Sequence, residues 1–341
     1  MTTDKKVLVT GGAGYVGSHA CKALAKAGYA PIVYDNFVHG HHWAVRYGDL
    51  EYGDILDRAR LDEVMAKHTP EAVLHFAAFA YVGESVGDPS KYYRTNVAGT
   101  ENLLQAMRDY DVGKIVFSSS CAVYGNPERL PITEDMPKNP INPYGVSKLI
   151  VERMLVDFHA AHGLNWVALR YFNAAGCDPD GEIGEIHSPE THIIALALDV
   201  ASGRRDKLIV FGTDYDTPDG SCIRDYVHVS DLADAHIKAL HALDNGMESR
   251  AFNLGTGRGF SVLDIIASVE RVTGRPVPYE VGARREGDPA ILISDAHDAR
   301  TILGWTPAIT ELDDIVRTAW RWHDRVNSGR RRVDRYRVGS V

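Results

Sequence analysis

The stretch that decides the fold is V-L-V-T-G-G-A-G-Y-V-G, residues 7–17. Its first half is a short apolar run with β-strand character, and its second half is a glycine-rich loop. Residues 18–27 continue with the spacing of apolar side chains that is typical of a helix, and residues 32–34 return to strand character. The order strand, glycine loop, helix, strand predicts a βαβ unit.

Three glycines of this loop are spaced three residues apart, at Gly11, Gly14 and Gly17. Because glycine lacks a Cβ atom, the backbone amides of such a loop can approach a pyrophosphate at the positive end of the following helix. Asp35 ends the next strand, at the position where a carboxylate binds ribose hydroxyls. Its charge would repel a 2′-phosphate, so we expect the cofactor to be NAD rather than NADP.

Two further apolar runs, residues 72–78 and 114–117, are nearly continuous, as expected of strands buried on both faces of a parallel sheet. Strands alternate with helices up to residue 173, including a helix expected over residues 89–107. This alternation predicts an α/β fold with a doubly wound parallel (Rossmann) sheet. Ligands of such sheets lie outside the carboxyl ends of the strands. The residues expected at those ends are Gly11, Asp35, Asp54, Ala77 and Ser120.

The chain is 341 residues long, which is more than a single core usually accommodates. We therefore predict an NAD-binding domain over residues 1–173, completed by segments near 225–256. A smaller substrate-binding lobe is expected mainly over residues 174–341, with an interleaved boundary. Within that lobe, helices are expected over residues 191–202 and 261–273, the second capped by Ser261.

Composition narrows the possible partners and the compartment. The net charge of -9 argues against nucleic acid, and the one concentrated basic run, residues 330–337, lies at the C-terminus. No run approaches 18 apolar residues and no secretory leader is visible, so no membrane partner is expected. Four scattered cysteines predict reduced thiols and a cytoplasmic protein. The histidines at positions 39, 41 and 42 lie in a glycine-containing loop, and no metal site is predicted.

A candidate acid/base group follows the middle of the chain. Tyr144 and Lys148 are four residues apart, which places them on one face of a helix, and Ser120 follows a predicted strand. A nearby cation, Lys148 or a bound nicotinamide, is expected to lower the pKa of the tyrosine phenol toward neutrality. Taken alone, the pair is better explained as a surface tyrosine beside a solvated lysine.

Together with the glycine loop and Ser120, the Tyr-x-x-x-Lys pattern resembles the extended short-chain dehydrogenase/reductase family. The resemblance implies that Tyr144 is the acid/base, that Lys148 binds the nicotinamide ribose and lowers the tyrosine pKa, and that Ser120 binds the reacting oxygen. These three would be the catalytic residues. The residues it assigns to NAD are Gly11, Gly14, Tyr15, Val16, Gly17, Asp35, Asn36, Asp54, Ile55, Phe76, Ala77, Ala78, Asn96, Ser118, Tyr144, Lys148 and Tyr171.

Further runs are similar to the UDP-glucose 4-epimerase family over nearly the whole chain, namely residues 76–78, 81–85, 92–100, 171–173, 212–215, 224–226 and 284–288. The resemblance implies that a UDP-sugar is oxidised at C4, that the 4-keto sugar turns over, and that it is reduced on its other face. It also implies a homodimer. The residues it assigns to the substrate are Ser120, Tyr144, Asn173, His192, Ile193, Val210, Phe211, Arg224, Arg285, Asp288 and Leu292.

Alternative functions can be distinguished by the side chains that they require directly after Ser120. Related enzymes that dehydrate or decarboxylate nucleotide sugars have acidic side chains there, whereas this chain has Cys121 and Ala122. Ala80 replaces a lysine that is frequent near the cofactor, and the surrounding pattern also resembles enzymes of UDP-xylose and UDP-arabinose. Leu292 is of intermediate size at a position that limits an N-acetyl group. Pentose and N-acetylhexosamine substrates therefore stay open, as does a non-catalytic NAD-binding regulator.

Overall fold

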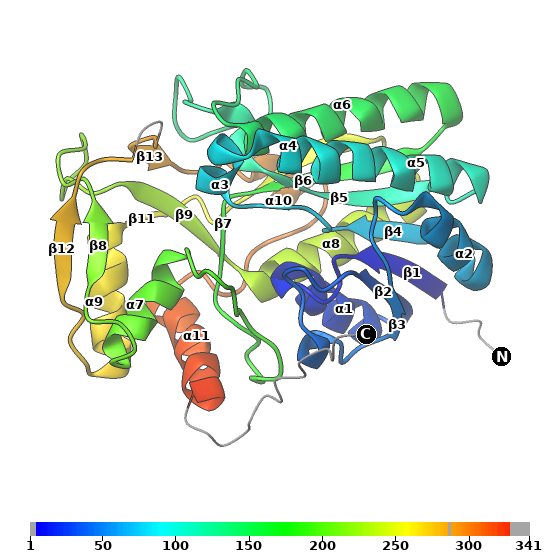
Figure 1. Cartoon of the computed structure of the whole chain (residues 1–341). Helices are drawn as coiled ribbons and strands as arrows, with labels where there is room; N and C mark the ends of the chain where they lie inside the picture. Colours follow the sequence, from blue (N-terminus) through cyan, green and yellow to red (C-terminus); the bar gives the residue numbers. More distant parts are fainter. Residues whose placement is uncertain (1–4, 286–287, 328–341) are drawn as a thin grey trace.

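A seven-stranded sheet forms the centre of the molecule in the computed structural model, which describes residues 5–285 and 288–327 (Figure 1). Every neighbouring pair of its strands is parallel. The predicted doubly wound parallel sheet is thus confirmed. In spatial order the strands are β10 (Arg250–Leu254), β6 (Asn165–Tyr171), β5 (Lys114–Ser120), β4 (Ala72–His75), β1 (Lys5–Thr10), β2 (Tyr29–Asp35) and β3 (Asp49–Tyr52).

Helices cover both faces of this sheet (Figure 1). Successive side chains of β1 point to opposite faces, so Val7 and Val9 join one core and Leu8 joins the other. This explains why the strand sequences are apolar throughout instead of alternating. The first core is covered by α1 (Tyr15–Lys26) and α8 (Val229–Asp244), and the second by α2 (Arg58–His68), α5 (Thr100–Asp109) and α6 (Pro143–His162).

The helix expected over residues 89–107 is divided into three segments in the structure. It begins as α4 (Pro89–Tyr92), continues as the π-helical segment η2 (Tyr93–Gly99) and ends in α5. π-Helical turns often occur at functional sites, and this one carries Asn96. Three further short helices are α3 (Val82–Gly87), η1 (His42–Ala44) and η3 (Cys121–Tyr124).

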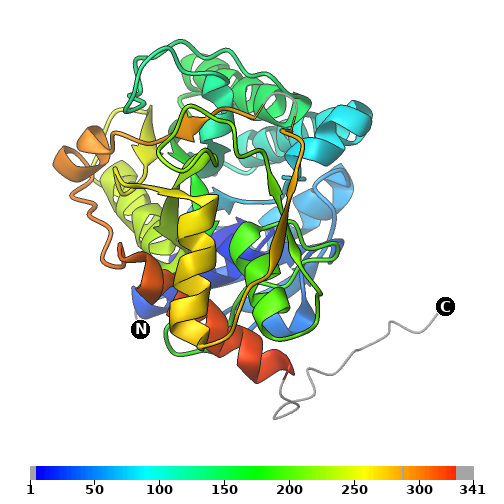
Figure 2. The ribbon, with the colours of Figure 1, turned by 90° about the vertical axis from the view of Figure 1, so that its left-hand side faces the viewer.

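A second group of elements packs beside the carboxyl ends of the large sheet (Figure 2). Ser261 caps its helix α9 as predicted, since Ser261 and Asp264 exchange reciprocal hydrogen bonds. The strands are β7 (Asn173–Ala175), β8 (Leu208–Phe211), β9 (Ile223–His228), β11 (Gly259–Ser261), β12 (Tyr279–Gly282) and β13 (Ile291–Leu292). Its helices are α7 (Ile193–Ala201), α9 (Val262–Thr273) and α11 (Leu312–Asn327). Helix α10 (His297–Thr301) instead packs on the first core of the large sheet.

The chain passes between the two groups more than once. After β8 and β9 it enters α8, which packs on α1, and then β10, which pairs with β6 at the sheet edge. The position of the boundary at residue 173 remains a prediction. The basic run at residues 330–337 lies outside the described residues. Within residues 5–285 and 288–327, no helix combines the length and the apolar character needed to cross a membrane.

Candidate active site

The glycine loop forms a tight turn between β1 and α1. Gly11 has φ of +72°, and a Cβ atom there would lie 2.7 Å from the backbone nitrogen of Ala77. A Cβ atom on Gly17 would lie 2.2 Å from the carbonyl oxygen of Gly11. The N-cap residue Gly14 offers no side chain, so the first amides of α1 have no side-chain cap. Free amides at a helix N-terminus are suited to a phosphate group.

Asp35 lies at the carboxyl end of β2, next to this loop. Its carboxylate accepts hydrogen bonds from the backbone amides of Ala13, at 2.9 Å, and Phe37, at 2.8 Å. Burial raises the pKa of Asp35 and the two amides oppose that rise. Beyond it, Asn36 donates to Asp54 at 2.9 Å, on the wall of a hollow of about 410 Å³. The loop and the two carboxylates together fit a dinucleotide.

Asn96 contacts protein groups on every side of its amide. It accepts a hydrogen bond from the backbone nitrogen of Phe79 at 2.8 Å and donates to the carbonyl oxygen of Phe79 at 2.9 Å. It also donates to Ser147 Oγ at 3.0 Å. The structure therefore shows Asn96 fixing the segment after β4 against α6, and its assignment to the cofactor stays a prediction.

Ser120, Tyr144 and Lys148 are brought together by β5 and α6. Helix α6 begins where the Asn142 side chain accepts a hydrogen bond from the amide of Gly145 at 2.9 Å. One turn later, Lys148 Nζ donates to the carbonyl oxygen of a β5 residue, Ser118, at 2.7 Å and lies 5.9 Å from the Tyr144 ring centre. The structure thus brings together the phenol of Tyr144, the hydroxyl of Ser120 and the amine of Lys148.

Burial controls the electrostatics of this group. It raises the pKa of Tyr144, and a hydrogen bond with Ser120 only partly opposes the rise. Burial also lowers the pKa of Lys148 to about 7, against a weak opposing effect of Glu152. Burial of the phenol thus shifts the pKa of Tyr144 opposite to the expected direction, and the lowering of this pKa by Lys148 or a bound nicotinamide stays a prediction.

A buried ion pair lies behind β5, and the sequence analysis missed it. Glu152 on α6 accepts hydrogen bonds from Ser119 Oγ at 2.6 Å and from Arg170 Nε at 2.8 Å. Both charged side chains are almost fully buried. Glu152 lies four residues after Lys148, on the same face of α6, and this spacing is the only sequence signal for it.

Five of the residues assigned to the substrate belong to the second group of elements. Arg224 on β9 is ion-paired with Asp288 and also donates to the carbonyl oxygen of Pro289 at 2.7 Å. The guanidinium carbon of Arg285 lies 4.1 Å from the ring centre of Phe211. Leu292 packs against the small core formed by η3 and Phe172, which places β13 beside the residues that follow Ser120.

Four other predicted substrate residues occupy element ends or the core. Asn173 begins β7, His192 is the N-cap residue of α7, and Ile193 is the first residue of that helix. The side chain of Val210 is buried in the core of the second group. Tyr171 is hydrogen-bonded to Ser118, so these two predicted cofactor residues contact each other. Contact of each residue with a ligand remains a prediction.

Residues 7–255 match the family described as the NAD dependent epimerase/dehydratase family. The chain belongs to this family. It is 54% identical over 321 residues to a UDP-glucose 4-epimerase of Rhizobium leguminosarum bv. trifolii, covering 94% of this chain and 98% of the relative. The resemblance inferred from the motifs is thus confirmed.

Solved structures of the family superpose closely on this chain. The UDP-glucose 4-epimerase from Brucella ovis, in complex with NAD, is 57% identical with a TM-score of 0.91, covering 93% of this chain and 97% of that one. The enzyme from Stenotrophomonas maltophila, with bound NAD and formylated UDP-arabinopyranose, is 40% identical with a TM-score of 0.92, covering 95% and 99%.

Proposed function

We propose that this protein is an NAD-dependent enzyme that interconverts UDP-glucose and UDP-galactose by epimerisation at C4. The observation that carries the proposal is the grouping of Ser120, Tyr144 and Lys148 beside the glycine loop of a dinucleotide-binding sheet. The extensive identity to UDP-glucose 4-epimerases supports it.

The chain's own residues supply positioning and proton transfer. When bound, NAD accepts and returns the hydride of sugar C4. Tyr144 takes the proton of the 4-hydroxyl group as C4 is oxidised, and gives it back after the 4-keto sugar has turned over. Ser120, at the carboxyl end of β5, orients the reacting oxygen. Lys148, held by the carbonyl oxygen of Ser118, binds the ribose of the nicotinamide.

The segment after Ser120 favours epimerisation over dehydration or decarboxylation. Residues 121–124 form η3, and this segment contains no carboxylate. Burial raises the pKa of the Cys121 thiol to about 12, so Cys121 is a neutral group at physiological pH. A reaction that needs a second acid or base beside the sugar therefore finds none in this segment. Epimerisation requires only the proton that Tyr144 carries.

Arg224, Arg285 and Asp288 are the proposed contacts for the UDP part of the substrate. Guanidinium groups match the oxygens of a pyrophosphate, and a carboxylate accepts hydrogen bonds from ribose hydroxyls. We also propose a cytoplasmic homodimer. Support for the compartment comes from the four cysteines, all of which are free thiols. Light scattering of the purified protein tests the dimer.

The direct test is to incubate the purified protein with UDP-galactose, without added cofactor, and to measure UDP-glucose. Tyr144→Phe should reduce the rate by roughly 10²- to 10⁴-fold, because the proton acceptor is lost. Tyr110→Phe, at an exposed tyrosine, is the matched control and should leave the rate unchanged. Absence of turnover in the wild-type protein with every UDP-sugar would support a non-catalytic NAD-binding protein instead.

A pentose substrate is the second candidate, and a specific observation favours it. A neighbour that is 40% identical was solved with formylated UDP-arabinopyranose. Leu292 is of intermediate size, so its bulk does not decide among hexose, N-acetylhexosamine and pentose. Comparing kcat/KM for UDP-galactose, UDP-N-acetylgalactosamine and UDP-arabinose decides among them. We expect the largest value for UDP-galactose.

A further inference from the structure

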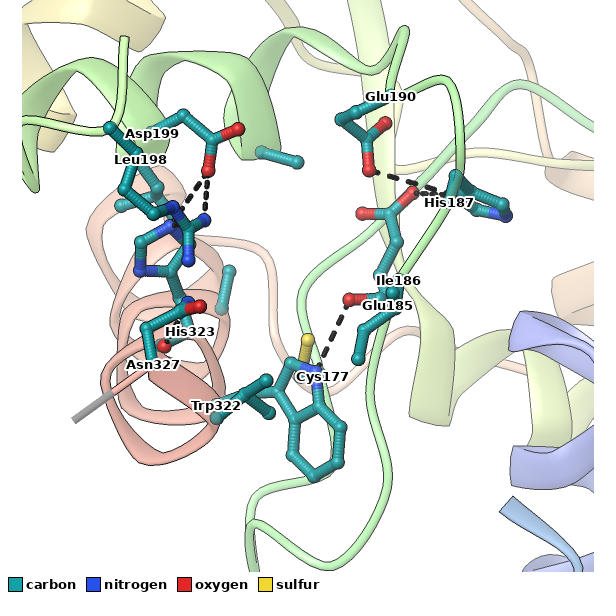
Figure 3. Close-up of a pocket in the computed structure, with 14 residues that line it drawn as sticks. Cys177, Glu185, Ile186, His187, Glu190, Leu198, Asp199, Trp322, His323 and Asn327 are labelled. Atoms are coloured by element: carbon teal, nitrogen blue, oxygen red, sulfur yellow. Dashed lines mark hydrogen bonds and ion pairs between the residues drawn. The ribbon is translucent and has the colours of Figure 1, made fainter. Parts of the chain in front are cut away.

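Two carboxylates and two imidazoles meet on the loop between β7 and α7. They belong to Glu185, His187, Glu190 and His192, in the pattern E-x-H-x-x-E-x-H. Figure 3 shows Glu185, His187 and Glu190 gathered on one wall of a pocket whose opposite wall is formed by α7 and α11. Apart from the substrate contact predicted for His192, the proposed reaction uses none of them.

The separations of the four side chains suit a shared ion. One ligand atom of each residue lies within 4.8 Å of the others. His192 Nδ1 is 2.8 Å from Glu185 Oε1 and 3.0 Å from Glu190 Oε1. His187 Nδ1 is 3.3 Å from Glu185 Oε1 and 3.8 Å from Glu190 Oε2. Four ligands at about 2.0 Å from a tetrahedral ion are about 3.3 Å apart, in the middle of this range.

Two buried atoms of the cluster have no hydrogen-bond partner. The Glu185 side chain is only 9% exposed, and its Oε1 atom makes no hydrogen bond despite the short distances. His187 Nδ1 is likewise buried and without a hydrogen bond. An unsatisfied buried polar atom is unfavourable and calls for an explanation. A cation that accepts a lone pair from both atoms would satisfy them together.

The donor set indicates which cation fits. Two imidazole nitrogens and two carboxylate oxygens are typical ligands of zinc, whereas calcium and magnesium prefer oxygen ligands alone. The two carboxylates also balance the charge of a divalent ion. A cavity of about 140 Å³, lined by Glu185, His187 and Glu190, gives access to the site.

A second acidic cluster provides the contrast. Asp178, Asp180 and Glu182 also gather on this loop, but Lys22 Nζ already contacts all three carboxylates. That cluster is a satisfied ion-pair network. The cluster at residues 185–192 differs because two of its buried atoms, although ion-paired, make no hydrogen bond within the described residues.

We propose that Glu185, His187, Glu190 and His192 bind one Zn²⁺ ion. Four protein ligands make a closed site, which is typical of structural zinc. The ion would fasten residues 185–190 to the N-terminus of α7. The His187 ring also makes an edge contact with Tyr15, the first residue of the cofactor helix α1, with ring centres 6.2 Å apart. Zinc would therefore stabilise the loop beside the cofactor-binding turn.

Metal content and visible absorption test this proposal independently of enzyme activity. The wild-type full-length protein is treated with a chelator, incubated with Zn²⁺ and dialysed, and its zinc is measured by elemental analysis. We expect one zinc per chain. With Co²⁺ in place of Zn²⁺, we expect the absorption bands of a tetrahedral site. Zinc content at the background of a metal-free blank would overturn the proposal and leave an ion-pair network of carboxylates and imidazoles.

Two variants and a matched control locate the ion. His187→Asn and Glu190→Gln should each weaken zinc binding by roughly 10-fold or more and abolish the cobalt bands. His241→Asn, at an exposed histidine on α8, should change neither. Circular dichroism establishes that the variants are folded. Equal zinc affinity in all three would also overturn the assignment, because the ion would then be bound elsewhere.

Discussion

Two lysines of this protein are almost fully buried, and their surroundings differ completely. Lys148 is 3% exposed and Lys22 is 5% exposed. Lys148 Nζ donates to a neutral carbonyl oxygen, that of Ser118, and burial lowers its pKa to about 7. Burial lowers the pKa of Lys22 as well, but the hydrogen bonds of its three carboxylate neighbours outweigh this effect and raise the pKa above its ordinary value.

The difference separates a structural cation from one placed for chemistry. Lys22 joins α1 to the loop after β7, and its Asp178 partner, 4% exposed, has its charge balanced there. Among the described residues, Lys148 has no carboxylate as a hydrogen-bond partner, and it lies beside Tyr144. A buried lysine without a counter-ion destabilises the fold, and such groups cluster at functional sites.

The largest expected effect is on turnover. Lys148→Met should lower kcat for UDP-galactose by roughly 10²- to 10⁴-fold, since the group that holds the nicotinamide ribose next to Tyr144 is lost. Lys22→Met should retain most of the activity at a temperature where it is folded. Initial-rate assays of both variants measure this. Equal losses in the two variants would contradict the division between them.

For stability, we expect the opposite order: Lys22→Met should have the larger effect and Lys148→Met the smaller one. Lys22→Met leaves the buried charge of Asp178 without its counter-ion, with only the backbone amide of Glu182 as a donor at 3.0 Å, which should reduce the free energy of unfolding by about 3–5 kcal/mol. Lys148→Met removes a cation that has no counter-ion and should reduce the free energy of unfolding far less. Urea unfolding of the two variants at pH 7 provides the comparison. A smaller loss for Lys22→Met than for Lys148→Met would contradict it.

The two lysines also predict different dependences of stability on pH. The folded-state pKa of Lys148 is about 7, below the value of about 10.4 in an unfolded chain. Between these two pH values the unfolded state binds one more proton than the folded state. Lys148 therefore makes the free energy of unfolding rise with pH, by about 1.4 kcal/mol per pH unit. The pKa of Lys22 is raised, so this lysine is charged in both the folded and the unfolded state below its unfolded pKa. Its contribution to the free energy of unfolding is therefore constant over the same pH range.

Unfolding of the nucleotide-free protein at pH 7, 8 and 9 measures this dependence. In Lys148→Met, the increase of the free energy of unfolding with pH that Lys148 contributes should be absent. In Lys22→Met, this increase should be retained. The difference between each variant and the wild type removes the contributions of other titrating groups. The same slope in the wild type and in Lys148→Met would show that Lys148 does not titrate near pH 7.

The smallest effect is expected within the Lys22 network itself. Asp180 contacts Lys22 Nζ at 2.7 Å, but its side chain is 63% exposed. Asp180→Asn should therefore change the free energy of unfolding by only about 0–1 kcal/mol, since Asp178 and Glu182 remain. Thermal unfolding at low and high salt measures this. A loss as large as that of Lys22→Met would mean that the exposed carboxylate, and not Asp178, stabilises the lysine.

Sequence patterns predicted most of the large sheet because its elements are locally encoded. The glycine loop predicts a tight turn, because the close backbone contacts there leave no room for a Cβ atom. The position of Asp35 is predicted because it is the last residue of a recognisable strand. The apolar runs read as buried strands because both faces of the sheet are covered. Ser261 could be recognised as a cap from its place before an apolar helical segment.

Contacts between distant segments were not predictable in the same way. The hydrogen bonds from Asn96 to Phe79 and Ser147 were not predicted, because they depend on how η2 packs on α6. The pairing of Glu152 with Arg170 joins a helix to a strand. The raised pKa of Tyr144 was not predicted, because the burial of its phenol depends on the surrounding core, which four-residue spacing does not encode.

The strand order of the large sheet has a consequence for how the chain is made. Strand β10, at residues 250–254, is the edge neighbour of β6, at residues 165–171. During synthesis from the N-terminus, about 80 residues separate the two strands, and at 5–20 residues per second the edge of β6 stays unpaired for roughly 4–16 s. An unpaired strand edge is a template for pairing with other chains. The nascent protein is therefore most prone to aggregation in this interval, after its cofactor loop and acid/base residues have already been synthesised.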